Sequence, residues 1–223
     1  LDVELRNDYD NLIKYKKKLE EKQIANMQVH YLYAASFSKH KPRNQKQQEA
    51  FDYYLGQAEK FWMNMSVYEQ AMVSLVMHRY GKTGVAMNII ASLKERAQNS
   101  EEMGMYWSSN VLGYFWYQAP IETQAMLIEA FNEVADDTHA VEEMKLWLLR
   151  QKQTTDWKTT KATSEAVYAL LMTGSNLLDN DKPVEIQLGG KPLANVAVEP
   201  IRHEAGTGYV QTSWSGSDIK PDM

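Results

Sequence analysis

The chain has 223 residues, a formal net charge of -5 and 44% hydrophobic residues. Hydrophobic and charged fractions close to those of average globular proteins exclude a disordered or fibrous chain. The sequence lacks the basic excess that binding to a phosphate backbone requires, so we expect no nucleic-acid partner. No stretch reaches the roughly 18 to 20 consecutive apolar residues that span a bilayer, so we expect no membrane-embedded segment.

Cysteine is absent from the sequence. Disulfide bonds, thiol catalysis and cysteine-based zinc sites are therefore excluded within this chain. The sequence starts at Leu1 rather than at a methionine, and it ends in polar turn residues from Ser215 to Met223. We therefore expect a fragment of a larger protein, whose targeting signals could lie outside it.

The segment from Asn7 to about Gly174 has apolar residues at intervals of three and four, which is the periodicity of α-helices. Ser66 and Glu69 form a capping box, in which each side chain satisfies a free amide at the start of a helix. Gly81 follows the expected end of that helix, where a left-handed backbone favours glycine. Helical structure is therefore expected through most of the chain.

Further helix boundaries are predicted from capping residues. Thr83 and Thr138 are expected to cap helices, because a threonine hydroxyl accepts a hydrogen bond from a free amide. Pro120 is expected at a first helical position, where its missing N–H is not needed. The last helix is expected to start near Thr159 and to end at Gly174.

The expected helices show an internal repeat. A shift of 54 residues relates Glu69-Gln70-Ala71-Met72 to Thr123-Gln124-Ala125-Met126, Ala86 to Ala140 and Arg96 to Arg150, and a shift of 41 relates Trp116 to Trp157, Thr123 to Ser164 and Ala125 to Ala166. Such a period is typical of helical hairpins that bury a core by stacking on their neighbours. The repeat is compatible with an open solenoid or with a closed ring.

The composition changes after the helical segment. Residues 184–188 alternate apolar and polar side chains, and Gly189-Gly190 can form a hairpin turn. Further β-forming residues follow at Val196, Val198, Tyr209 and Val210. We therefore divide the chain into a helical domain, residues 1–178, and a β-rich segment, residues 179–223.

Candidate residues for chemistry are few. The histidines are His30, His40, His78, His139 and His203, and none has the spacing of a metal-ligand pair. Asp136 and Asp137 could bind a metal or donate a proton, but they also precede the expected cap Thr138, where acidic residues favour the positive helix end. Residues 81–84 lack the spacing of a phosphate-binding loop. We predict no catalytic, cofactor-binding or metal-ligating residue and no cofactor.

Aromatic residues are crowded between Tyr106 and Tyr117. They are Tyr106, Trp107, Tyr114, Phe115, Trp116 and Tyr117. Such a cluster is typical either of core packing between hairpins or of a ligand groove or protein interface. The sequence favours core packing but leaves both interpretations open.

Three segments carry a resemblance to a known family, namely Ile121–Ala130, Trp147–Lys152 and Trp157–Leu171. Their order resembles the later helices of the thioester domain of the α2-macroglobulin family, and its bacterial branch fits best. The family pattern is E-T-T-A, then a W-L helix ending in Q-[KR], then a G-W-x-S-T turn and an A-L-x-A-L helix. Here Asp156 stands where the family has the glycine of that turn.

The resemblance implies a mainly α fold, an α/α toroid of helical hairpins over residues 1–178, followed by the start of or a return to a β-sandwich domain. It implies a large secreted or periplasmic, cell-surface parent protein that traps proteases as an endopeptidase inhibitor. The expected partners are neighbouring domains of the same chain and proteases, which would bind to the full-length parent protein. The family's C-x-E-Q thioester has no counterpart here, because the chain has no cysteine.

Two other hypotheses stay open. One is an open helical-repeat scaffold that binds a peptide through its concave face. The other is an enzyme on an α/α toroid, such as a terpenoid cyclase or a polysaccharide lyase, in which Asp136, Asp137 and the aromatic cluster would line a central cavity. On balance, we expect a non-catalytic structural and interaction domain.

Overall fold

The computed structural model describes residues 1–111, 119–152, 157, 159–172, 187–188, 191–192, 202–204 and 209–217. The chain divides into two compact units, Leu1–Ser175 and Asn176–Met223. The boundary expected between residues 178 and 179 lies outside the described residues. The first unit is mainly α-helical, which confirms the expected fold class at that level.

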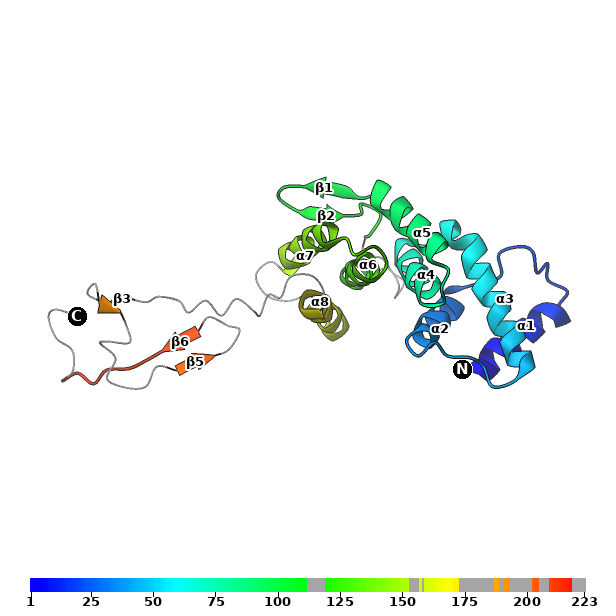
Figure 1. Cartoon of the computed structure of the whole chain (residues 1–223), viewed down its shortest axis with the longest axis horizontal. Coiled ribbons are helices and arrows are strands. Elements are labelled where there is room, and N and C mark those ends of the chain that lie inside the picture. The colour runs from blue at the N-terminus through cyan, green and yellow to red at the C-terminus, as the bar shows by residue number, and fades with distance from the viewer. Residues whose placement is uncertain are drawn as a thin grey trace. The chain divides into compact units, whose positions relative to one another are not determined.

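Figure 1 labels all of the described α-helices and strands except β4. The elements are α1 (Asp2–Lys14), α2 (Asn26–Ser36), α3 (Gln45–Phe61), α4 (Val67–Arg79), α5 (Thr83–Glu95), β1 (Gln98–Ser100), β2 (Gly104–Tyr106), α6 (Pro120–Ala135), α7 (Thr138–Lys152), α8 (Thr160–Met172), β3 (Gln187–Leu188), β4 (Lys191–Pro192), β5 (Arg202–Glu204) and β6 (Tyr209–Gln211). A short 3-10 helix, Trp62–Asn64, lies between α3 and α4.

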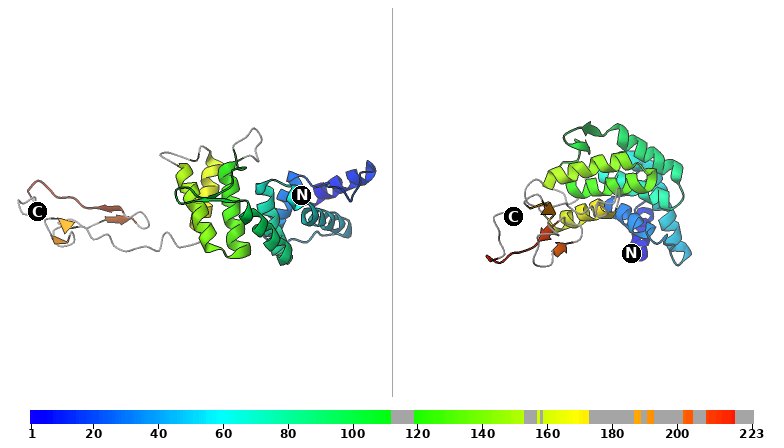
Figure 2. Two further views of the ribbon diagram at one scale, coloured as in Figure 1. Left: turned by 90° about the horizontal axis from the view of Figure 1, so that it is seen from above. Right: turned by 60° about the vertical axis from the view of Figure 1, so that its left-hand side comes forward.

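The helices of the first unit alternate between two positions. Helices α2, α4, α6 and α8 form an inner row, in which each helix packs against the next. Helix α5 returns along α4, and α7 returns along α6, as successive hairpins (Figures 1 and 2). Helix α1 packs against α3 at the start of the unit. Closure of these hairpins into a toroid stays a prediction.

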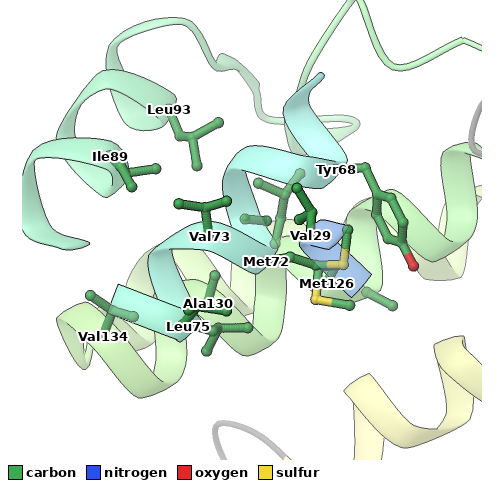
Figure 3. Packing of buried hydrophobic residues seen from close by; sticks show 14 of the residues in the cluster. Val29, Tyr68, Met72, Val73, Leu75, Ile89, Leu93, Met126, Ala130 and Val134 are labelled. Atoms are coloured by element: carbon green, nitrogen blue, oxygen red, sulfur yellow. The ribbon is translucent and has the colours of Figure 1, made fainter. Parts of the chain in front are cut away.

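The core is centred on α4. Nearly every residue from Tyr68 to Met77 is buried, because α2, α5 and α6 surround this helix. A helix that is apolar on all sides is stable only when it is enclosed. Each fully buried Leu or Met side chain contributes about 1.5 to 3 kcal/mol. Met72 and Met126, which the shift of 54 residues relates, both point into the contact between α4 and α6 (Figure 3).

Several predicted helix boundaries are confirmed. The Ser66 hydroxyl accepts a hydrogen bond from the Glu69 amide at 3.2 Å, and the Glu69 carboxylate accepts one from the Ser66 amide at 2.9 Å. Gly81 has the expected left-handed backbone, with φ of 80°. Pro120 begins α6 as its first residue. At the last helix, the Thr159 hydroxyl accepts from the Ala162 amide at 3.0 Å.

Two predicted caps are wrong. Thr83 and Thr138 are the first residues of their helices instead of the residues that precede them. Lys82 precedes α5 and makes no capping hydrogen bond through its side chain. Asp137 precedes α7, and its carboxylate accepts from the Ala140 amide at 3.1 Å. An ionised carboxylate is the stronger acceptor at a positive helix end, which explains why Asp137 takes this position.

A small hairpin, which was not predicted from the sequence, interrupts the helical segment. Strands β1 and β2 pair antiparallel, and β2 packs against α7. Gly104 has φ of 70°, and a Cβ atom at this residue would collide with the backbone oxygen of Glu143. Gln124 of α6 donates a hydrogen bond to the Met105 oxygen at 2.8 Å. Glycine is thus required where the hairpin approaches α7.

Two tryptophans form equivalent hydrogen bonds near the ends of α5 and α7. The indole N–H of Trp107 donates to the Leu93 oxygen of α5 at 2.9 Å, and that of Trp157 donates to the Leu148 oxygen of α7 at 3.0 Å. Both residues are buried. Each indole satisfies a backbone acceptor near a helix end. Trp107 therefore has the same role at the end of α5 that Trp157 has at the end of α7.

The second unit contains two described strand pairs. Strands β3 and β4 pair antiparallel on either side of Gly189-Gly190, where the sequence predicts a turn. Strands β5 and β6 also pair antiparallel, and β6 contains the expected Tyr209 and Val210. The turn residues, with Val196 and Val198, lie outside the described residues. A β-sandwich over residues 179–223 stays a prediction.

Candidate functional site

The inner row carries a charged cluster that joins α2, α4 and α6. We call it the Arg79 cage, and it consists of Tyr33, Phe37, Arg79, Glu129 and Glu133. The Nε and Nη2 atoms of Arg79 donate to the two oxygens of Glu133 at 2.7 and 2.6 Å. Nη2 also donates to Glu129 at 2.7 Å. The Tyr33 hydroxyl donates to the other oxygen of Glu129 at 2.8 Å.

Aromatic rings complete the cage. The guanidinium carbon of Arg79 lies 4.3 Å from the centre of the Phe37 ring and 5.4 Å from that of Tyr33. Cations at such distances are attracted to the negative face of an aromatic ring. The arrangement therefore recognises a guanidinium by two kinds of contact, carboxylates at its edge and rings at its face.

Burial and charge act in opposite directions on Arg79. Burial lowers the pKa of its guanidinium, but the hydrogen bonds to Glu133 and Glu129 outweigh burial and raise the pKa above its ordinary value. Burial and the charge of Glu129 likewise raise the pKa of Tyr33, so its hydroxyl stays a donor. The Arg79 guanidinium is therefore charged, and its contacts link α2, α4 and α6.

A hollow of about 440 Å³ lies beside the cage. It is lined by Ser36, Phe37, Lys39, Arg79, Glu129, Asn132, Glu133 and Tyr168. Phe37 and Tyr168 keep 61% and 45% of their surface exposed, so their rings can contact a ligand. The hollow combines aromatic walls with charged groups, which suits a peptide side chain more than an apolar small molecule.

A second group lies on the α4, α6 and α8 part of the inner row. We call it the Glu165 cluster, and it consists of Tyr68, Glu122, Lys161 and Glu165. Lys161 Nζ lies 6.0 Å from the centre of the Tyr68 ring. Burial raises the pKa of the Glu165 carboxyl, Lys161 lowers it, and the negative charges of Glu122 and Glu129 raise it further, for a net increase.

Tyr68 connects this cluster to the core. It is 7% exposed, and Figure 3 shows its hydroxyl directed away from the aliphatic side chains around Val73. Burial, followed by the charges of Glu165, Glu122 and Glu129, raises its pKa to about 12. The charges of these three carboxylates therefore act on the Tyr68 hydroxyl.

Glu122 is the unusual member of the cluster. Only 7% of its surface is exposed. No hydrogen bond or ion pair joins it to another residue in the part of the chain that the structure describes. Its position in the first turn of α6 gives it some stabilisation from the helix dipole. Little of this side chain is exposed to solvent, so its charge is screened less than that of a surface carboxylate, and a cationic ligand would supply the missing contact.

The residues considered from the sequence have structural roles. Asp137 caps α7 and pairs with Lys94 at 2.5 Å, so both of its oxygens are engaged. Asp136 has a left-handed backbone at the end of α6. Trp107 lies in the core, 6.0 Å from the Phe131 ring, as the core-packing interpretation predicts. Residues 114–117 of the aromatic cluster lie outside the described residues.

Sequence reasoning missed both groups on the inner row. It placed Arg79 only as a basic residue in the last turn of α4, and it assigned no role to Glu129, Glu133 or Glu165. One signal was available, because Glu133 stands 54 residues after Arg79, at the repeat shift. A repeat is recognised from similar residues at equivalent positions, so a pair of opposite charges at such positions does not stand out.

Among residues that the structure describes, no group of three His, Asp or Glu side chains is arranged to hold a metal ion. None of the described helices has the length and apolar character needed to cross a membrane. No family model, curated protein or solved structure matches the chain. The family resemblance therefore rests on the residues themselves.

Proposed function

We propose that this chain is a non-catalytic structural and interaction domain of a large α2-macroglobulin-like protein that traps proteases. The observation that carries the proposal is the order of the three resembling segments. Ile121–Ala130 lies in α6, Trp147–Lys152 ends α7, and Thr160–Leu171 of the third segment lies in α8. The motifs thus occupy three consecutive helices, in the order in which the family has them.

The role within such a protein follows from the residues present. Covalent capture of a protease requires a thiol to form the thioester, and this chain has no cysteine. The chain therefore contributes surface and support to trapping rather than the bond-forming step. The parent is proposed to be secreted, periplasmic or on the cell surface, as members of the family are.

The inner row favours a second candidate function, an open helical-repeat scaffold that binds a peptide. The specific observation is the hollow with exposed Phe37 and Tyr168 beside the Arg79 cage. Helical repeats commonly bind extended segments on their concave surface. Both functions make the chain an interaction domain, and they differ in whether the partner is a trapped protease or a peptide segment.

Incubation of the parent protein with trypsin tests the first function. A trapped protease still cleaves a small chromogenic peptide, because the peptide diffuses into the trap. The same protease resists a macromolecular inhibitor and no longer degrades a folded protein substrate. We expect this difference for the parent protein. Equal access of the small peptide and the large inhibitor, with no stable association, would exclude protease trapping.

A further inference from the structure

We propose that the Glu165 cluster binds an arginine residue of an extended segment of a partner protein, with Glu122 and Glu165 as its carboxylate partners. The proposal rests on the proposed role as an interaction domain, but not on protease trapping. The proposal specifies an arginine side chain as the group that the partner contributes.

The first argument is the balance of charge in the cluster. The charges of Lys161 and Glu122 both act on the Glu165 carboxyl, and Lys161 Nζ lies 6.0 Å from the centre of the Tyr68 ring, so the cluster contains two carboxylates and one ammonium group. Glu122 is nearly buried and has no partner among the described residues. Because solvent screens Glu122 less than a surface carboxylate, a cation that reaches it gains more from pairing than it would at an exposed site.

The second argument is the position of an exposed ring. Lys161, Glu165 and Tyr168 follow each other at intervals of four and three residues on α8, so they share one face of that helix. Tyr168 is 45% exposed. A guanidinium bound at Glu165 therefore has an aromatic surface within one helical turn.

The third argument is that the chain already binds one guanidinium in this manner. In the Arg79 cage, Glu133 takes the guanidinium edge and Phe37 takes its face. Tyr168 lines the hollow beside that cage and also lies on the face of Glu165. The Glu165 cluster repeats the carboxylate and aromatic elements of the cage without an arginine of its own. An arginine suits such a site better than a lysine, because its planar group bonds carboxylates and stacks on rings at once.

The fourth argument concerns the form of the ligand. The hollow of about 440 Å³ accepts side chains but no folded domain. The cluster and the hollow lie on consecutive helices of the inner row, so an extended segment can place one side chain in each. Lys161 is the internal competitor for Glu165, since it is the nearest cation on α8.

Fluorescence anisotropy with the full chain tests the proposal. The probe is a fluorescein-labelled Gly-Arg-Gly-Arg-Gly peptide at low ionic strength, and the reference is the same peptide with citrulline in place of arginine. Citrulline keeps the shape of arginine but lacks its charge. We expect the arginine peptide to bind, and we expect its affinity to fall as salt is added.

Four variants locate the site. Glu122→Gln and Glu165→Gln should each weaken binding of the arginine peptide at least about threefold. Lys161→Gln should tighten it, because the internal competitor is removed. Glu95→Gln on α5 is the matched control, since Glu95 is an exposed glutamate away from the inner row, and it should leave the affinity unchanged. Circular dichroism establishes that each variant is folded.

Three outcomes would overturn the proposal. They are equal binding of the arginine and citrulline peptides, equal weakening by Glu95→Gln and Glu165→Gln, and weaker binding after Lys161→Gln. A parent protein that traps trypsin while the chain fails these binding tests would disprove the arginine site alone. A chain that passes them within a parent that never associates with proteases would disprove the trapping function alone.

Discussion

Arg79 of α4 and Glu133 of α6 are equivalent residues of the helical repeat, and they pair directly with each other. Nε and Nη2 of Arg79 lie 2.7 and 2.6 Å from the two Glu133 oxygens, across 54 residues of sequence. The side chain of Arg79 is 10% exposed, and that of Glu133 is 33% exposed. The repeat therefore places opposite charges at matching positions of neighbouring inner helices, where they hold the helices together.

Replacement of Arg79 by glutamine should destabilise the helical unit by about 3 kcal/mol, because Glu129 and Glu133 lose their partner in a largely buried place. Urea unfolding followed by far-UV circular dichroism measures the change. Arg150→Gln is the control, since Arg150 is exposed, and its effect should stay within about 0.5 kcal/mol. An Arg79→Gln variant as stable as the control would show that the cage contributes little.

Gly104→Ala should destabilise the chain by about 2 kcal/mol or more, because alanine disfavours a positive φ and its Cβ would collide with the Glu143 oxygen. Gly56→Ala in α3 is the contrasting variant. Gly56 has open space around it, so alanine should stabilise the helix by about 0.5 to 1 kcal/mol. Thermal unfolding compares the two variants. Opposite signs are expected, and a neutral Gly104→Ala would contradict the close approach of β2 to α7.

Trp107→Phe should cost about 1 kcal/mol, since the Leu93 oxygen loses the indole donor and keeps the Arg96 amide, while most of the apolar contact is retained. Trp157→Phe should cost a similar amount, because its indole has the same role at Leu148. Hydrogen exchange should show faster opening at the end of α5 in the first variant and at the end of α7 in the second. Uniformly faster exchange in both variants would show that the two indole hydrogen bonds do not stabilise the two helix ends separately.

Glu165→Gln should make the stability of the chain less dependent on pH. The folded state raises the pKa of the Glu165 carboxyl above its ordinary value of 4.5, through burial and the charges of Glu122 and Glu129. The folded chain therefore binds this proton more tightly than the unfolded chain does, and stability is lost as pH rises from about 4.5 through the folded pKa. The variant does not lose stability in this way, because glutamine does not ionise.

Unfolding measurements over a pH series provide the readout for this prediction. We expect Glu165→Gln to be more stable than the natural chain at neutral pH and equal to it below about pH 4, where both side chains are neutral. Loss of binding to the arginine peptide with a gain in stability would be typical of a binding residue. A variant that is less stable at neutral pH would show that ionised Glu165 has a favourable partner.

Sequence alone determined the helical character and several helix boundaries. The capping box at Ser66 and Glu69, the glycine at position 81 and the proline at position 120 are local signals, because each acts on backbone groups within one helical turn. The same reasoning failed at Asp137, since two adjacent residues could each cap α7 and the sequence offers no rule for choosing between them. Strands β1 and β2 were missed because three residues are too few to show a period of two.

Only the tertiary structure decided which residues form the candidate site. Tyr33, Arg79 and Glu129 come from three helices, and the pattern within each helix shows which side faces the core but not which residues of its neighbours lie opposite. The repeat illustrates this limit. Gln70 accepts a hydrogen bond from Arg96, whereas Gln124, its equivalent, donates one to the oxygen of Met105. These two glutamines are both buried, while their polar partners depend on how neighbouring segments pack.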